Sequence, residues 1–423
     1  MTLPFDGKIY IKKRKAAQWS ALYIFAMPFL LAFFGFLGVP DFIKYTIDIA
    51  WVLAAAFLIA QKRLNISRRL TPFVIFVFIF FLYNIIVYFF NFQSIFYYLW
   101  GFRNNFRFFF AFLAFAVFFD ESDIKTCLKF IDVLFWVNAA VSFVQFFAMG
   151  YKQDLLGGIF GVERGANAYS AIFFAFVAAK SLLLFMNKQE KALPCFLKCS
   201  FTLILAALAE LKFYFILFIL VLIISAIFTS FSWRKLLLII GFAIVIMFSS
   251  SILTAIFGSS NSLTFERLFI LATSTSYANG EDLGRFTAIP TIAETILTDL
   301  PQQLFGMGMG NCDTSVFPIC NTPFYQANSL LNYTWFSSAF LFLETGYIGL
   351  ALYLSFFIIC LVFAVKAIKA KTANKLYCQI TVIMAVICIC LIFYNSSMRM
   401  EVGYIAFFAL ALPLIPKERA PRI

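Results

Sequence analysis

Apolar runs of about twenty residues recur along most of the chain, and short segments between them hold most of the charged residues. A helix needs roughly 20 mainly apolar residues to cross the hydrocarbon core of a bilayer. Within that core every backbone polar group must find a partner in the protein, which favours helices. The chain is 63% hydrophobic and only 13% charged, whereas soluble domains carry about 25% charged residues. We therefore expect an all-α polytopic membrane protein.

The apolar runs predict about twelve membrane spans and one long hydrophilic loop. The predicted spans are residues 18–37, 44–60, 71–90, 106–119, 127–149, 167–187, 195–210, 213–230, 236–256, 337–365, 376–394 and 402–416. Nine spans thus occupy residues 1–256, and three spans with a tail occupy 337–423. The loop at 257–336 separates them. Pro28 lies inside the first span, where neighbouring helices can satisfy the backbone groups that a proline frees.

The distribution of Lys and Arg predicts the orientation. With the N-terminus in the cytoplasm and the spans alternating, 24 of the 33 basic residues fall in cytoplasmic segments, as the positive-inside rule requires. We expect both termini inside and residues 257–336 outside. The net charge of +13 is then a topology signal, and no nucleic-acid partner is expected.

The loop at 257–336 contains an apolar repeat and two cysteines. Thr287–Leu300 has helical periodicity with Pro290 near its start, which predicts an amphipathic helix on the membrane surface; the alternative is a helix that packs over the bundle. Cys312 and Cys320 are the two cysteines outside. An oxidising compartment favours a disulfide between them, although two free thiols remain the alternative.

Nine basic residues remain outside or at membrane depth, where charge is costly and usually functional. Guanidinium groups bind phosphate oxygens in bidentate fashion and remain charged at physiological pH. A pyrophosphate at the level of the lipid head groups would suit such a set. For some of them a structural role is the alternative: anchoring in an aromatic belt for Arg103 and Arg107, and a local ion pair with Glu210 for Lys212. Seven of these nine are the candidates: Arg103, Arg107, Arg164, Lys212, Arg267, Arg285 and Arg399.

Several short motifs in the outside segments resemble those of one known family. They are Gly161-Val-Glu-Arg164-Gly165-Ala-Asn167, Glu210-Leu-Lys212, Gly284-Arg285 followed by Pro301, Leu304-Phe-Gly306-Met-Gly308-Met-Gly310-Asn311, and Glu344-Thr-Gly346-Tyr-Ile-Gly349-Leu350. Their order and the large late loop resemble the O-antigen and capsular polysaccharide polymerase and ligase superfamily, which includes Wzy-type polymerases. The resemblance covers roughly residues 155–355 in motifs and the remainder in topology alone.

The resemblance implies a glycosyltransferase of the bacterial cytoplasmic membrane that joins lipid-linked repeat units at its outer face. The donor and acceptor would be oligosaccharides on undecaprenyl diphosphate, and a chain-length regulator is a candidate protein partner. Arg164 and Arg285 would hold the diphosphate. Glu344 would be the general base, with Glu210 and Asp282 behind it; the alternative for Glu344 is a structural role in capping the following helix. No metal or other cofactor is expected, because the chain has no His and its outside carboxylates are scattered. Further substrate-binding candidates are Lys212, Arg267, Arg399, Glu210 and Asn167.

Two other functions compete with this expectation. Ligases of the superfamily carry His-Asn shortly before the Glu-x-Gly segment, but here the neighbourhood is Tyr333-Thr-Trp335-Phe336-Ser337-Ser338, which favours a polymerase. A flippase or other transporter usually has short loops and two similar halves. This chain has an 80-residue loop, and we find no such repeat in it.

Overall fold

The computed structural model describes residues 5–60, 68–229, 232–258, 273–274, 276 and 282–416, and these contain helices but no strand. Each predicted span overlaps a helix. The helices are α1 Phe5–Ala26, α2 Leu31–Phe36, α3 Thr46–Ala60, α4 Thr71–Asn91, α5 Ile95–Phe118, α6 Glu121–Phe143, α7 Ala166–Met186, α8 Ala192–Leu208, α9 Lys212–Ile227, α10 Trp233–Phe257, α12 Ala288–Thr295, α13 Leu300–Phe305, α14 Pro323–Asn328, α15 Ser337–Ala370, α16 Lys375–Tyr394 and α17 Gly403–Ala411.

Seven stretches of the described chain form helices that are long and apolar enough to cross a membrane. They are Phe42–Ile59, Thr71–Asn91, Glu121–Ala148, Ala166–Met186, Trp233–Phe257, Ser337–Ala370 and Lys375–Tyr394. Three shorter apolar helices accompany them, at Ala192–Leu208, Lys212–Ile227 and Gly403–Leu414. This content identifies a multi-pass membrane protein.

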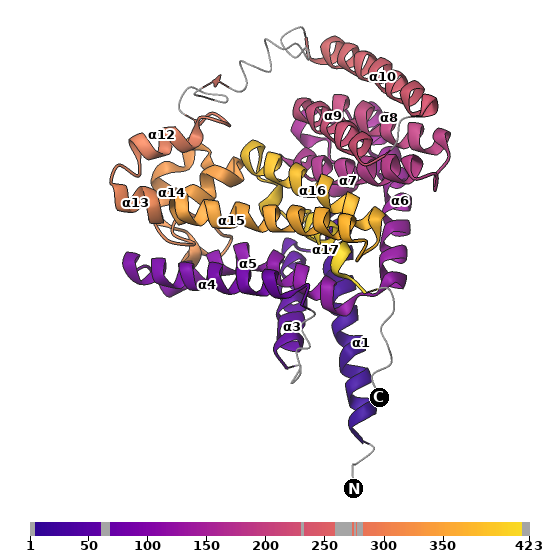
Figure 1. Cartoon of the computed structure of the whole chain (residues 1–423). Coiled ribbons are helices and arrows are strands. Elements are labelled where there is room, and N and C mark those ends of the chain that lie inside the picture. The colour runs from indigo at the N-terminus through magenta and orange to yellow at the C-terminus, as the bar shows by residue number, and fades with distance from the viewer. Residues whose placement is uncertain are drawn as a thin grey trace.

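The middle of the bundle is built from α7, α15 and α16 (Figure 1). In the apolar windows of α7 and α16, 83% and 72% of the residues are buried within the protein, against 22% in α10. On one side of this centre α4 packs on α15 and beside α5, and on the other side α8 and α9 pack on α7 (Figure 1). The helices α7 and α16 therefore lie largely inside the protein, and the C-terminal end of α16 positions the candidate site.

Side-chain contacts sort the connections between helices into two opposite ends. At one end, Arg103 pairs with Asp48, Gln93 bonds to Met309, and Arg285 bonds to Tyr394. At the other end, Gln18 bonds to Asp123, and Asn187 bonds to Gln379. These two groups match the segments expected outside and inside, respectively. We refer to the first group as the outer end, following the predicted orientation.

The first predicted span is not one continuous helix. It breaks at Pro28 into α1, a 3-10 turn at Met27–Phe29 and the short helix α2. Proline lacks the N–H that an α-helix needs, and its ring clashes with the carbonyl four residues earlier. The predicted span thus accommodates Pro28 through a local 3-10 turn between two helices.

The amphipathic helix expected at 287–300 is shorter and packs on the bundle. It forms α12, which ends at Thr295, and Leu300 already begins α13. Pro290 lies in the first turn of α12, as expected. Ala288 and Ile292 are fully buried, and α12 packs against α15. The alternative of a packing helix thus describes α12 better than a surface-bound one.

Candidate functional site

Several segments of the outer end contact the turn between α16 and α17, residues 394–402. The backbone carbonyl of Tyr394 accepts a hydrogen bond from Nη1 of Arg285 (2.7 Å), and that of Asn395 accepts one from the hydroxyl of Ser337 (2.9 Å). The carbonyl of Arg399 accepts from Nη2 of Arg107 (2.7 Å). Segments from α5, α15 and the long loop are therefore tied to one turn.

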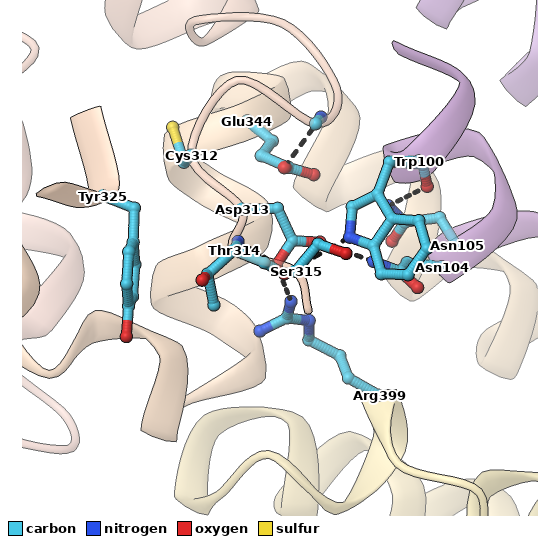
Figure 2. A network of polar contacts seen from close by, with 12 residues as sticks. Trp100, Asn104, Asn105, Cys312, Asp313, Thr314, Ser315, Tyr325, Glu344 and Arg399 are labelled. Atoms are coloured by element: carbon cyan, nitrogen blue, oxygen red, sulfur yellow. Dashed lines mark hydrogen bonds and ion pairs between the residues drawn. The ribbon is translucent and has the colours of Figure 1, made fainter. Parts of the chain in front are cut away.

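Arg399 extends from this turn toward Asp313, which lies in the long loop (Figure 2). Its Nη2 is 3.5 Å from Oδ1 of Asp313, and its guanidinium lies over the ring of Phe340, 3.1 Å from the centroid. The other oxygen of Asp313 accepts from the amide of Asn104 (2.5 Å). Burial lowers the pKa of Arg399, and the carboxylates of Asp313 and Glu344 oppose that shift. The pair joins α5 and the long loop to the 394–402 turn.

Glu344 is fully buried and holds the glycine-rich segment 304–310. Its Oε1 accepts from the backbone N–H of Gly310 (2.8 Å), and the carbonyl of Glu344 accepts from the N–H of Gly308 (2.9 Å). Gly346 has a positive φ of 63° and interrupts the helical geometry of α15 there. The close approach of Gly346 to Leu304 leaves no room for a Cβ atom. The buried Glu344 side chain thus serves as a hydrogen-bond acceptor that holds this segment in place.

A second buried ion pair lies behind the turn. Nη1 of Arg107 is 3.1 Å from Oε1 of Glu401, and the hydroxyl of Tyr169 donates to Oε2 of Glu401 (2.8 Å). Arg107 is only 3% exposed. Burial by itself would raise the pKa of Glu401, but the Arg107 guanidinium and the Tyr169 hydroxyl lower it to about 2. The pair remains charged at physiological pH.

Arg164 and Arg285, the two cations expected to hold a diphosphate, occupy different surroundings. Arg285 lies over the ring of Tyr394, 4.1 Å from its centroid. Arg164 is exposed, and it has no hydrogen bond or ion pair with a residue that the structure describes. A Cβ atom on its neighbour Gly165 would lie 3.9 Å from Cε of Met400. Both arginines are therefore carried by segments that adjoin the 394–402 turn.

Lys212 and Asn167 lie at the same end and have partners within the protein. Nζ of Lys212 is 3.2 Å from Oε1 of Glu210, so the local ion pair considered as an alternative is present. The next residue, Phe213, stacks on Tyr394 with ring centroids 4.0 Å apart. The amide of Asn167 donates to Asp154 (3.0 Å) and to the carbonyl of Ala209 (3.1 Å). Asn167 thus ties the start of α7 to the α8–α9 connection.

The predicted disulfide is absent, which corrects one expectation. Cys312 and Cys320 are both free and buried. Sγ of Cys312 lies 3.9 Å from Sδ of Met307, and Sγ of Cys320 lies 4.0 Å from the carbonyl of Phe96. Burial raises the pKa of both thiols, most strongly that of Cys312. The thiolate that disulfide exchange requires is therefore disfavoured. The sequence placed both cysteines on one face but could not give their directions.

The remaining expected positions lie in or near the long loop, and two of them fall outside the described residues. Arg267 and Glu281 lie outside the described residues. Asp282 is buried and accepts from the hydroxyl of Ser276 (2.5 Å). Among the described residues, no three Cys, Asp or Glu side chains lie close enough together to hold a metal ion.

Sequence reasoning missed the partners of the charges in α5. Arg103 pairs with Asp48 (2.9 Å) and lies over the rings of Tyr45 and Trp100, which fits the aromatic anchoring considered for it. Arg107 lies in the protein interior instead, so belt anchoring is wrong for that residue. The one indication in the sequence was the group of polar residues 103–107 at the start of an apolar run. Nothing in the sequence indicated that Asp313 is the partner of Asn104.

The chain was compared with models of known protein families and with curated proteins. Neither comparison found a match.

Proposed function

We propose that the protein is a glycosyltransferase of the polysaccharide-polymerase type. It would join repeat units carried on undecaprenyl diphosphate at the outer face of the bacterial cytoplasmic membrane. One observation supports the proposal: the 394–402 turn contains Arg399, accepts a hydrogen bond from Arg285, and lies beside Gly165 and Phe213, the residues that directly follow Arg164 and Lys212. Charged residues near a bilayer are commonly functional, and guanidinium donors match the oxygens of a diphosphate.

The proposed reaction exchanges one glycosidic bond for another. The hydroxyl oxygen of the acceptor sugar bonds to the anomeric carbon of the donor glycan, while the bond from that carbon to the diphosphate breaks. The diphosphate leaves with the electron pair. Arg164 and Arg285 bind the diphosphate and stabilise the charge that develops on it. Lys212 and Arg399 add positive potential, and a carboxylate accepts the proton of the acceptor hydroxyl.

Burial decides which carboxylate suits the role of base. Glu344 is 0% exposed and Asp282 is 4% exposed, so a sugar hydroxyl reaches neither without a rearrangement. The side chain of Glu210 is 19% exposed and lies beside Lys212. We therefore assign the proton acceptor to Glu210 and give Glu344 a positioning role through Gly310.

Variants of the two arginines test the diphosphate site. Arg164→Ala and Arg285→Ala should each abolish long-chain polymer while the protein level in the membrane stays unchanged. Lysine at either position should restore only part of the activity, because a point charge cannot reproduce bidentate contacts. Lys152→Ala is the matched control, since Lys152 is also at the outer end but lies over Phe146. Normal polymer length in both alanine variants would refute the proposal.

Amide substitutions distinguish the role of Glu210 from that of Glu344. Glu210→Gln removes the proton acceptor and should lower the rate of polymerisation by about 100-fold, with little change in KM. Glu344→Gln keeps an oxygen that can accept from Gly310, so it should retain most activity, whereas Glu344→Leu should not. Equal losses in both glutamine variants would contradict this division of roles.

Deletion of the gene distinguishes the proposal from its competitors. Single repeat units on the lipid carrier at the outer face indicate a missing polymerase, which is the expected result. Single units retained at the inner face would indicate a flippase, and full-length unattached chains would indicate a ligase. Either of these two outcomes overturns the proposal.

A further inference from the structure

Three helix ends meet at the end of the bundle opposite the outer end, which we call the inner end. The amide of Asn187, where α7 ends, donates to Oε1 of Gln379 in α16 (3.0 Å). The hydroxyl of Thr229, just after α9, donates to Sδ of Met186 in α7 (3.5 Å). The end of α7, the start of α16 and the end of α9 therefore lie side by side.

Lysines from three helices gather at this place. Lys188 directly follows the end of α7, Lys375 is the first residue of α16, and Lys235 lies in the first turn of α10. The charges of Lys188 and Lys375 both act on that of Lys235. Glu190, in the same connection as Lys188, pairs with Lys198 instead (2.8 Å). We call Lys188, Lys235 and Lys375 the inner basic cluster; charges of one sign gathered in this way attract anions.

The backbone of Lys188 shows that the turn itself does not require a lysine. Its φ is 61°, in the left-handed region, immediately after the last residues of α7. Helices commonly end with glycine in this conformation, because a Cβ atom is disfavoured there. Lys188 is nevertheless exposed at the surface. Its ammonium group is thus presented to the surroundings from a position that glycine would fill with less strain.

One face of α10 continues from the inner basic cluster along the bilayer. The helix lies at the edge of the bundle and packs on α8 (Figure 1). Apolar residues spaced three or four apart form an exposed stripe on one side of it. They are Trp233, Leu237, Ile240, Ile244 and Met247, with exposed fractions of 72%, 67%, 49%, 62% and 70%. Tryptophan is typical of the head-group level of a membrane, so the stripe begins where the lysines lie.

We propose that the inner basic cluster binds the phosphate of an anionic phospholipid, such as phosphatidylglycerol or cardiolipin, whose acyl chains lie along the stripe of α10. Basic pockets between membrane helices bind such head groups. A zwitterionic head group brings an amine that the lysines repel, and a free phosphate leaves the apolar stripe uncovered. The proposal is independent of glycosyl transfer, because the cluster lies at the end opposite the candidate site.

Native mass spectrometry of the purified protein in detergent tests the binding. The probes are phosphatidylglycerol and phosphatidylcholine with identical chains, added in parallel titrations. We expect one phosphatidylglycerol to be retained per chain, with about tenfold higher affinity than phosphatidylcholine. Equal affinities would overturn the proposal. The soluble head group, glycerophosphoglycerol, should not displace the lipid; displacement at equal concentration would assign the cluster to a soluble phosphate and refute the lipid site.

Charge variants locate the site. Lys188→Gly combined with Lys375→Ala should lower the affinity for phosphatidylglycerol by about tenfold, whereas arginine at both positions should preserve it. The Tm of Lys188→Gly should stay close to that of the wild type, because relief of the backbone strain offsets loss of a cation at the end of α7. The matched control is Lys125→Ala with Lys129→Ala, two exposed inner-end lysines of α6. An equal loss of affinity in this control would contradict a defined site.

Fluorescence quenching tests where the acyl chains lie. The protein is placed in vesicles that contain brominated phosphatidylglycerol or brominated phosphatidylcholine at the same mole fraction. The contribution of Trp233 is the difference between the wild type and Trp233→Phe. We expect brominated phosphatidylglycerol to quench this contribution more strongly than brominated phosphatidylcholine does, and the difference should vanish in Lys188→Gly with Lys375→Ala. Equal quenching by the two lipids in the wild type would overturn the placement on α10.

Discussion

Arg107 shows how a charge can lie within an apolar helix. Its guanidinium is almost fully enclosed, and the carboxylate of Glu401 and the carbonyl of Arg399 accept two of its hydrogen bonds. The ring of Phe108 lies 4.6 Å from it. Taking such a charge out of water costs several kcal/mol, and only a well-placed partner offsets that cost. The pair therefore fixes α5 against the 394–402 turn.

Loss of the Glu401 carboxylate should strongly destabilise the protein. Glu401→Gln leaves Arg107 without its counter-charge, which should cost about 3–5 kcal/mol at pH 7. Thermal unfolding in detergent measures the effect as a lower Tm, and Glu163→Gln at an exposed site is the control. An unchanged Tm in Glu401→Gln would show that the pair contributes little.

The same pair predicts a pH dependence with a definite sign. The pKa of Glu401 is lowered from 4.5 to about 2, so its contribution to stability is fully present above about pH 4.5. It is lost as the pH falls from there toward 2, because the unfolded chain binds the proton first. The Tm of the wild type should fall more steeply with acid than that of Glu401→Gln. Parallel curves would contradict the assigned pKa.

At the scale of elements, the glycine-rich segment docks on α5 through backbone contacts. A Cβ atom on Gly101 would lie 2.7 Å from Cα of Gly310, and one on Gly310 would meet the carbonyl of Tyr97. Gly310 also has a positive φ of 86°. Only glycine satisfies both the conformation and the contact. The spacing of glycines in this segment thus reflects the packing of a loop against a helix.

Gly310→Ala should displace the glycine-rich segment and, with it, Asp313. We expect a destabilisation of about 1–3 kcal/mol and loss of long-chain polymer. Gly35→Ala is the matched control, because nothing lies within 4 Å of a Cβ atom at Gly35. Measurements of Tm and polymer length on both variants decide the matter; normal values for Gly310→Ala would mean that the contact yields easily.

For the whole molecule, the grouping of connections at two ends predicts which sites are accessible from each side. Val316, 66% exposed, lies at the outer end, and Gln189, also exposed, lies at the opposite end. Val316→Cys should react with a membrane-impermeant maleimide in intact cells, whereas Gln189→Cys should react only after permeabilisation. The reverse pattern would invert the orientation that the basic residues predict.

The proposed chemistry also predicts independence from metal ions. If arginines bind the departing diphosphate, the purified protein should polymerise lipid-linked repeat units in excess EDTA at an undiminished rate. Activity that disappears in EDTA and returns with magnesium or manganese would require carboxylate ligands instead. Glu281 and Asp282 would then be the first positions to replace.

The sequence by itself determined where the helices lie, because apolar runs of the right length have few alternatives in a bilayer. The segment predicted at 71–90 is α4, Thr71–Asn91, and that at 376–394 is α16, Lys375–Tyr394. The prediction at 106–119 found only part of α5, which begins at Ile95. Arg103 and Arg107 lower the local hydropathy, yet their partners in the fold let the helix continue.

Only the tertiary structure decided which side chains meet. Arg107 and Glu401 are 294 residues apart, and Asn104 and Asp313 are 209 apart; no local pattern encodes either pair. The cysteine expectation failed for the same reason, since shared placement in a loop does not fix the direction of two thiols. Periodicity and hydropathy are properties of a segment, whereas charge pairing and backbone contact depend on how segments pack together. The positions of the helices could therefore be predicted from the sequence, whereas the candidate site depends on how the ends of these helices pack together.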